Sequence, residues 1–165
     1  MDLVGELPRL RRYARALTGD RHRADDLVQD TVERALRKAP LWRRGSRLDA
    51  WLLTLMHNIF INQWRGSHSG ANLPLDELPA EPATRPLQTD ALELLDLQAA
   101  LARLPPEQRA VLLLVTLEEK TYEETAAILD LPLGTVMSRL ARARERLRRE
   151  LAGEPVAASA LKVVK

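Results

Sequence analysis

An arginine-rich stretch near the end of the chain is the part of the sequence best suited to bind a charged partner. Between Met137 and Arg149 there are six arginines and a single acid, Glu145. Guanidinium groups gathered on one helix bind phosphates well, because release of the counterions condensed on DNA drives the association. The alternative for such a helix is an ordinary solvated face with good helix propensity.

The residues around the arginines indicate a helix-turn-helix that would present them outward. Thr121 and Glu124 have the spacing of a capping box, which begins a short acidic helix, and Pro132 lies in the turn that follows. The second helix has an apolar stripe at helical spacing, formed by Val136, Leu140, Ala143 and Leu147. Its opposite side carries Thr135, Ser138, Arg139, Arg142, Arg146 and Arg149. This scaffold is the one that places a helix in a DNA groove, which favours the nucleic-acid interpretation.

A second polar stripe, here called the acidic ridge, consists of Asp26, Gln29, Asp30 and Glu33. Its spacing of i, i+3, i+4 and i+7 places it on one side of a helix. The apolar stripe on the other side comprises Ala24, Leu27, Val28, Thr31, Val32, Ala35 and Leu36. An acidic surface cannot contact phosphates. It is either a solvated face or a docking surface for a basic partner protein, whose encounter would be steered by charge.

The third predicted helix has a polar side that would suit single-stranded nucleic acid. Its apolar side contains Leu52, Leu55 and Ile59. The polar side is predicted to comprise His57, Asn58, Ile61, Asn62, Trp64 and Arg65, with Arg43, Arg44 and Arg47 in the basic loop just before the helix. An aromatic ring among Asn, His and Arg side chains can stack on unpaired bases and hydrogen-bond to their edges. The alternative is that Trp64 packs against a neighbouring helix or the following connector.

The hydrophobic periodicity predicts an all-α fold. Besides the helix-turn-helix, the expected helices are Leu7–Leu17, Ala24–Leu36, Leu48–Arg65, Asp90–Leu104 and Glu107–Leu117. The basic loop 42–47 contains Gly45 as its helix breaker. No segment alternates between apolar and polar residues with period two, so no sheet is expected.

Charge and proline content divide the chain into two expected helical domains, residues 1–66 and 90–152. Residues 67–89, with four prolines, are the expected flexible linker, and residues 153–165 are the expected disordered tail. The net charge is +5 over residues 1–65, −5 over residues 66–96 and +2 over residues 97–165. A chain of 165 residues can bury either one ordinary core or two small ones.

The composition argues against several classes of protein. There is no cysteine, and no apolar run approaches the roughly 20 residues that span a bilayer. No Gly-rich phosphate loop or metal-ligand grouping is present, and the three histidines lie on different predicted elements. We therefore expect a cytoplasmic protein without a signal peptide, which is not an enzyme, has no catalytic residues and binds no metal, cofactor or membrane.

Three segments carry a resemblance to a known family. They are Ala24–Leu36 (ADDLVQDTVERAL), Leu48–Arg65 (LDAWLLTLMHNIFINQWR) and Leu104–Arg148, which includes the helix-turn-helix. In this order and spacing they resemble the extracytoplasmic-function (ECF) class of bacterial RNA polymerase sigma factors, over most of residues 7–150. The resemblance implies two small helical domains that bind core RNA polymerase, recognise the minus-35 and minus-10 promoter elements and help to open the DNA.

The resemblance also implies a role for each surface. The acidic ridge would dock on the clamp helices of the polymerase's largest subunit, and the flap region of the second-largest subunit would be a further contact. Flipped single-stranded bases of the minus-10 element would meet Arg43, Arg44, Ser46, Arg47, His57, Asn58, Ile61, Asn62, Trp64 and Arg65. The minus-35 duplex would meet Thr135, Met137, Ser138, Arg139, Arg142, Arg144, Arg146 and Arg149. In this class an anti-sigma protein is a common further partner.

The chain departs from the family pattern at three positions. It has Met137 where many members carry a basic residue, and His57 and Asn62 where Arg and Asp are frequent. Because Met137 cannot donate a hydrogen bond to a guanine edge, readout there is either absent or apolar, for example against a thymine methyl group. The promoter preference of other members therefore does not carry over.

Two other functions are open from the sequence alone. One is a stand-alone helix-turn-helix regulator, which would need a dimer face and a symmetric operator, although no heptad or spare apolar face is evident. The other is a sigma mimic that sequesters an anti-sigma protein without touching DNA. The arginine-rich helix and the lack of an attached receiver domain argue against the mimic.

Overall fold

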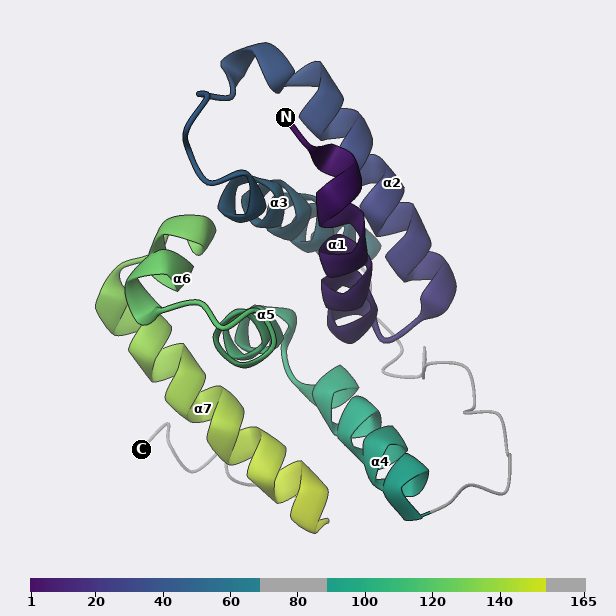
Figure 1. The fold of residues 1–165 in the computed structure, drawn as a ribbon. Helices are drawn as coiled ribbons and strands as arrows, with labels where there is room; N and C mark the ends of the chain where they lie inside the picture. The colour runs from purple at the N-terminus through teal and green to yellow at the C-terminus, as the bar shows by residue number, and fades with distance from the viewer. Residues whose placement is uncertain (69–88, 154–165) are drawn as a thin grey trace.

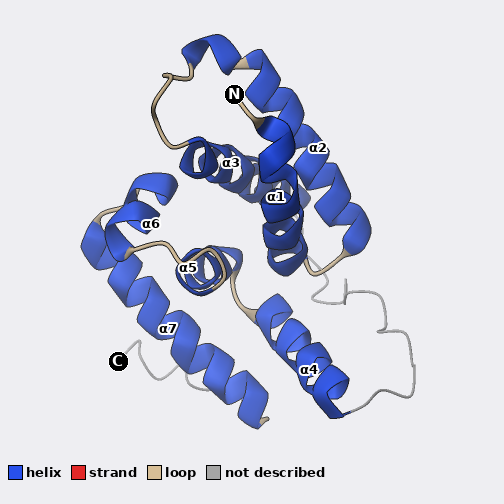
Figure 2. Cartoon of the chain, viewed as in Figure 1, coloured by secondary structure: helices blue, strands red, loops and turns tan. Residues whose placement is uncertain are grey.

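The computed structural model describes residues 1–68 and 89–153, and its helices form two groups (Figure 1). The N-terminal half contains α1 (Leu3–Thr18), α2 (Arg21–Arg37), the 3₁₀ helix η1 (Ala39–Leu41) and α3 (Leu48–His68). The C-terminal half contains α4 (Thr89–Arg103), α5 (Pro106–Thr116), α6 (Tyr122–Leu129) and α7 (Leu133–Ala152). Within these described ranges there is no strand (Figure 2), so the predicted all-α fold is confirmed.

Polar side chains cap the N-termini of three of the described helices. Asp2 and Asp20 each accept a hydrogen bond from the backbone N–H three residues further on, at 3.1 and 3.3 Å. Thr121 and Glu124 form the predicted capping box, in which each side chain accepts a hydrogen bond from the other's backbone N–H at 3.0 Å. These bonds satisfy amides that the first turn of a helix otherwise leaves unpaired.

The helix boundaries differ from the expected ones mainly at the ends of each half. Because Asp2 acts as a cap, α1 begins at Leu3 instead of Leu7 and includes Pro8 within its length. Helix α3 extends to His68 and α4 begins at Thr89, so three residues of the predicted linker are helical. The predicted flexibility of the rest of the linker, residues 69–88, lies outside the described residues.

Three of the described glycines have a left-handed backbone where the chain breaks, the first being Gly19 at the end of α1. Gly45, with a φ of 91°, turns the basic loop as predicted, and Gly153, with a φ of 73°, ends α7. Residue 153 is therefore the helix C-cap and not part of an irregular tail. The predicted disorder of residues 154–165 lies outside the described residues.

The two halves share one hydrophobic core, although the length of the chain would also allow two small cores. Fully buried side chains from the N-terminal half include Tyr13, Leu17, Leu27, Leu52 and Met56, and those from the C-terminal half include Leu104, Val111, Leu114, Val136 and Leu140. Helix α1 contacts α4 and α5, and α3 contacts α5 and α6 (Figure 1). The core therefore places the surfaces of one half directly against those of the other.

Candidate nucleic-acid interface

The acidic ridge lies on the outer surface of α2. Its exposed members are Asp26, Gln29 and Glu33. Asp30 is half-buried and accepts a hydrogen bond from Gln63 of α3 at 2.9 Å. The predicted apolar stripe packs inward except at Leu36, which is 59% exposed.

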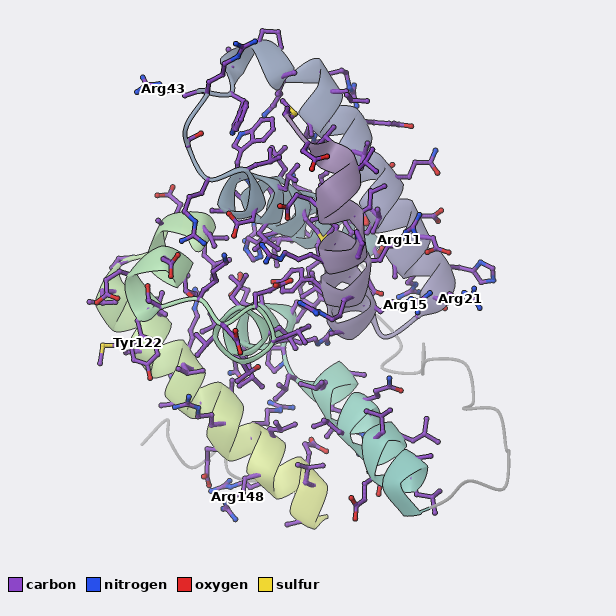
Figure 3. All side chains as sticks on the ribbon, in the orientation of Figure 1. Arg11, Arg15, Arg21, Arg43, Tyr122 and Arg148 are labelled. Atoms are coloured by element: carbon purple, nitrogen blue, oxygen red, sulfur yellow. The ribbon has the colours of Figure 1, made fainter. Side chains whose placement is uncertain are left out.

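The basic loop is anchored to α3 by two tryptophans. The ring centroids of Trp42 and Trp51 are 6.4 Å apart, with 37° between the ring planes. Ser46 donates a hydrogen bond to the backbone carbonyl of Arg43 at 2.6 Å, which tightens the turn. Arg43 and Arg44 are exposed, and Arg43 extends away from the ribbon (Figure 3). These contacts thus hold the loop in place while Arg43 and Arg44 remain exposed to solvent.

The polar face of α3 is smaller than predicted. Its exposed members are Asn58, Asn62, Trp64 and Arg65. His57 is half-buried, and Ile61 is only 7% exposed and belongs to the hydrophobic core, so the prediction that Ile61 projects away from the core is wrong. The reason is that α3 is covered on a second side by the C-terminal half, whose Leu129 and Leu131 line the same cleft as Ile61.

This open cleft runs between the two halves and gathers polar residues from both. Its polar lining consists of Arg34, His57, Asn58, Asn62, Arg65, Glu107 and Arg139. The predicted base-contacting residues of α3 therefore share one cleft with an arginine from the predicted recognition helix. The sequence alone does not indicate this arrangement, because the two helices are distant along the chain.

Helix α7 buries the apolar stripe that the sequence predicts, and its predicted DNA-contacting residues differ in exposure. Val136, Leu140 and Ala143 are buried and Leu147 is partly buried. The exposed candidates are Met137, Ser138, Arg142 and Arg144, and the half-buried ones are Thr135, Arg139, Arg146 and Arg149. Arg149 pairs with Glu145 at 3.0 Å within the helix, and the neighbouring Arg148 projects outward (Figure 3). The exposed group is the part of α7 that a duplex could reach in this conformation.

A cluster of charges joins the first turn of α3 to the C-terminal half. The Asp49 carboxylate accepts hydrogen bonds from Lys120 of the α5–α6 loop, from Arg9 of α1 at 3.0 Å and from Arg47 at 3.1 Å. Burial alone would raise the pKa of Asp49, but the hydrogen bonds from Lys120, the Ala50 amide and Arg47 outweigh it and hold the pKa at about 2. Asp49 is therefore ionised at neutral pH and pairs with a buried lysine.

A second acid of the α5–α6 loop faces α1. Glu118 is buried, with Arg12 3.5 Å and Arg9 3.6 Å from its Oε2. Burial raises the pKa of Glu118, against the lowering effect of the two arginines. Burial, reinforced by the charge of Glu118, also raises the pKa of the enclosed Tyr13 hydroxyl. Ionic contacts thus hold α1 as well as α3 against the C-terminal half.

Glu107, in the first turn of α5, bridges the two halves across the cleft. Its Oε1 lies 3.5 Å from Arg65 of α3, and its Oε2 lies 3.6 Å from Arg139 of α7. Burial lowers the pKa of the adjacent His57 to about 4, with Glu107 raising it and Arg139 and Arg65 lowering it. His57 is therefore neutral at pH 7. Glu107 does not stand out in the sequence, because an acid in the first turn of a helix is already explained by the helix dipole.

Two families match the chain, one in each half. Residues 3–57 match the Sigma2 domain of PhyR, and residues 94–147 match Sigma-70, region 4. The first match covers the acidic ridge and the start of α3, and the second covers the helix-turn-helix. A sigma2 domain followed by a region 4 helix-turn-helix is the arrangement of a sigma factor.

Individual relatives extend the similarity over most of the chain. The ECF RNA polymerase sigma factor EcfG of Rhodopseudomonas palustris is 38% identical over 146 residues, which are 88% of this chain and 81% of that protein. The structure of the sigma factor RpoE in complex with the anti-sigma factor NepR, from Bartonella quintana, matches with a TM-score of 0.73 and 36% identity, over 92% of this chain and 94% of that one. The anti-anti-sigma factor PhyR of the same organism, solved with NepR, shares the fold at 20% identity, with a TM-score of 0.61 over 88% of this chain and 47% of that one.

The chain belongs to the ECF class of RNA polymerase sigma factors. It is an alternative sigma factor, which binds core RNA polymerase, recognises promoter minus-35 and minus-10 elements and promotes DNA melting. Sigma factors are not themselves catalysts. Among the described residues, no helix has the length and hydropathy needed to cross a bilayer, and no group of His, Asp and Glu could hold a metal ion.

Proposed function

We propose that the acidic ridge of α2 is the surface by which this sigma factor docks on the clamp helices of the largest polymerase subunit. Three of its four members are exposed, and they form an acidic strip in a half whose net charge is positive. A basic partner surface would be steered to this strip by charge. Asp30, which Gln63 orients from α3, lies at the centre of the strip.

The ridge assignment can be tested with a double charge reversal. Asp30→Arg combined with Glu33→Arg should abolish co-purification with core polymerase, because two attractive contacts become repulsive. Glu93→Arg combined with Asp96→Arg, which reverses two exposed acids of α4 with the same spacing, is the matched control and should co-purify normally. Unchanged binding by the ridge variant, with its helical content intact, would refute the assignment.

The two DNA surfaces are assigned in the same way. The basic loop and the exposed polar residues of α3 capture single-stranded minus-10 bases, with Asn58 as the base-edge contact. The exposed face of α7 reads the minus-35 duplex, with Arg142 near the groove and Arg144 on a phosphate, and the half-buried Arg146 and Arg149 are proposed as further phosphate contacts. The flap region of the second-largest subunit is the further polymerase contact. The observation that carries these assignments is the exposure of the cations Arg43, Arg44 and Arg47 on the basic loop and of Arg142 and Arg144 on α7.

The decisive experiment is run-off transcription with purified core polymerase on fragmented genomic DNA. Addition of the chain should produce new transcripts whose start sites share a minus-35 and a minus-10 sequence at constant spacing. Core polymerase alone on the same fragments is the control. If the chain confers initiation on no fragment while still binding core polymerase, the assignment of the DNA surfaces fails.

A second candidate function is a sigma mimic that sequesters an anti-sigma protein. The match of residues 3–57 to the Sigma2 domain of PhyR favours it. The exposed Arg142 and Arg144 on α7 favour the DNA-binding function instead, because a mimic has no use for a phosphate-binding surface. A mimic would relieve inhibition of another sigma factor in a transcription assay but would not support initiation by itself.

An anti-sigma protein is also proposed as a partner of the sigma factor itself. The support is the Bartonella quintana sigma factor, which shares this fold at 36% identity and was solved with its anti-sigma factor NepR. Such a partner would suppress the run-off transcripts when added in equimolar amount. Because the polymerase acts on the chromosome, the proposed place of action is the cytoplasm.

A further inference from the structure

The cleft between the two halves is large enough to hold a small molecule. Its volume is about 470 Å³, which lies within the range of about 300–1,000 Å³ found for sites that bind small ligands. Residues of α2, α3, α5, α6 and α7 line it. A molecule bound there would therefore contact both halves at once.

Basic side chains outnumber acidic ones in this cleft. Its charged lining consists of Arg34 of α2, Arg65 of α3, Arg139 of α7 and Glu107 of α5. Glu107 lies 3.5 Å from Arg65 and 3.6 Å from Arg139, which is longer than the roughly 2.8 Å of a strong charge-assisted hydrogen bond. A single carboxylate thus offsets the charge of three guanidinium groups only in part, and the cleft remains attractive to an anion.

Arg34 is the cation of the cleft that the rest of the described structure leaves unpaired. Its side chain makes no hydrogen bond or ion pair within residues 1–68 and 89–153. By contrast, Arg47, another arginine that faces the C-terminal half, pairs with Asp49 and with Glu124 of α6. Arg34 belongs neither to the acidic ridge nor to a proposed DNA surface, so the proposed function gives it no role.

Uncharged polar groups of the cleft are also available to a ligand. The buried Nδ1 of His57 has no hydrogen-bond partner among the described residues, and an unpaired buried polar atom is unfavourable. The side chains of Asn58 and Asn62 are exposed and make no hydrogen bond within the same part of the chain. A carboxamide both donates and accepts, so these two groups suit the edge of a nucleobase.

Part of the cleft wall is apolar. Ile61 of α3, Leu129 of α6 and Leu131 of the following turn line it. A nucleobase can bury apolar surface against these side chains, whereas an inorganic anion gains nothing from them. Arginines, carboxamides and an apolar wall in one cleft are the groups that phosphates, base edges and a base ring require.

We propose that this cleft is a binding site for a free nucleotide with two or more negative charges, such as a nucleoside diphosphate. Its phosphates lie among Arg34, Arg65 and Arg139, and its base lies on the apolar wall within reach of Asn58 and Asn62. The inference goes beyond the proposed function, which concerns polymerase and promoter DNA.

Isothermal titration calorimetry of the full chain with ADP, at constant ionic strength, tests the site. Inorganic pyrophosphate and adenosine are the comparators, because each lacks one part of the nucleotide. ADP should bind about three- to tenfold more tightly than pyrophosphate, since only ADP can use the apolar wall. Adenosine, which has no phosphate, should bind more weakly than either. No binding at millimolar ADP would overturn the proposal.

Charge-matched variants locate the bound phosphates. Arg34→Gln and Arg139→Gln should each weaken ADP binding by about five- to thirtyfold, because each removes a charged hydrogen-bond donor from the cleft. The controls are Arg37→Gln on α2 and Arg144→Gln on α7, which remove the same charge from exposed residues outside the cleft and should change the affinity less than about twofold. Circular dichroism checks the helical content of all four. Equal losses in the four variants would reveal only a general attraction of anions to a basic protein, and would overturn the proposal.

The imidazole of His57 provides a second readout inside the cleft. Burial lowers the pKa of His57 to about 4, and Glu107, Arg139 and Arg65 also act on it. A bound phosphate should raise this pKa, because negative charge favours the imidazolium form. His22, which is exposed near the start of α2, is the internal reference in the same NMR titration. ADP binding that leaves the pKa of His57 unchanged would place the nucleotide elsewhere and overturn the assignment.

Run-off transcription with the wild-type chain tests the proposed function separately. If ADP binds in the cleft as expected and the chain supports no initiation with core polymerase, the proposed function fails and the nucleotide site stands. If initiation succeeds and Arg34→Gln leaves ADP binding unchanged, the nucleotide site fails alone.

Discussion

A single buried arginine joins the corner between α4 and α5 to the end of α1. Arg109 is 8% exposed, and its guanidinium donates hydrogen bonds to four backbone carbonyls. These belong to Leu101 at 2.8 Å, Ala102 at 3.0 Å and Leu104 at 2.8 Å, around the end of α4, and to Leu17 at 2.5 Å, at the end of α1. Helix C-termini attract cations, and their last carbonyls have no partner within the helix.

Replacement of this arginine should therefore be costly. Burial lowers the pKa of Arg109 to about 10, so the side chain is still charged at neutral pH. Arg109→Ala leaves four carbonyls without their donor and opens a cavity, and we expect a loss of about 3–5 kcal/mol in the free energy of unfolding. Arg109→Lys retains the charge but has one nitrogen to serve the four carbonyls, and should lose about 1–3 kcal/mol.

Urea unfolding followed by circular dichroism measures both losses. The control is Arg103→Ala, whose side chain is 62% exposed and pairs with Glu150 at the surface, and which should change the free energy by less than about 1 kcal/mol. A typical domain is stable by only about 5–15 kcal/mol, so Arg109→Ala should show a markedly lower urea midpoint. The reasoning is wrong if Arg109→Ala costs no more than Arg103→Ala.

Two further predictions concern the DNA surface and pH. Arg142→Ala should weaken promoter binding by the polymerase complex by about 1–3 kcal/mol in a sequence-dependent way, whereas Arg144→Ala should weaken binding to all promoter sequences alike. Gel shifts on promoter variants measure both effects. A uniform loss for Arg142→Ala would show that Arg142 contacts a phosphate instead of a base. Burial lowers the pKa of His57 in the folded state to about 4, whereas the pKa of histidine in an unfolded chain is about 6.5. As the pH falls from 7 to 5, the unfolded state therefore takes up a proton at His57 and the folded state does not. The free energy of unfolding should decrease by about 1–2 kcal/mol over this range. In urea unfolding, His57→Gln should remove this decrease in the free energy of unfolding. An NMR titration that gives His57 an ordinary pKa in the folded protein would contradict the prediction.

Much of the fold and of each surface could be predicted because the relevant signals are local. The capping box relates Thr121 to a residue three positions away, and the buried stripe of α7 repeats every three or four positions. The same periodicity placed most of the acidic ridge on the outside of α2. The family resemblance also rests on motifs within single helices and one helix-turn-helix.

What the sequence determined by itself was therefore most of each helix, the capping box of α6, the polarity of most helix faces and the class of protein. Only the tertiary structure decided that Ile61 is buried, that Glu107 bridges two arginines and that Arg109 caps α1. Arg47 and Glu124 are 77 positions apart, and Arg109 lies 92 positions from Leu17. Helical periodicity relates residues within one helix and carries no information about which helices meet, so the packing of the two halves, which encloses these contacts, could be seen only in three dimensions.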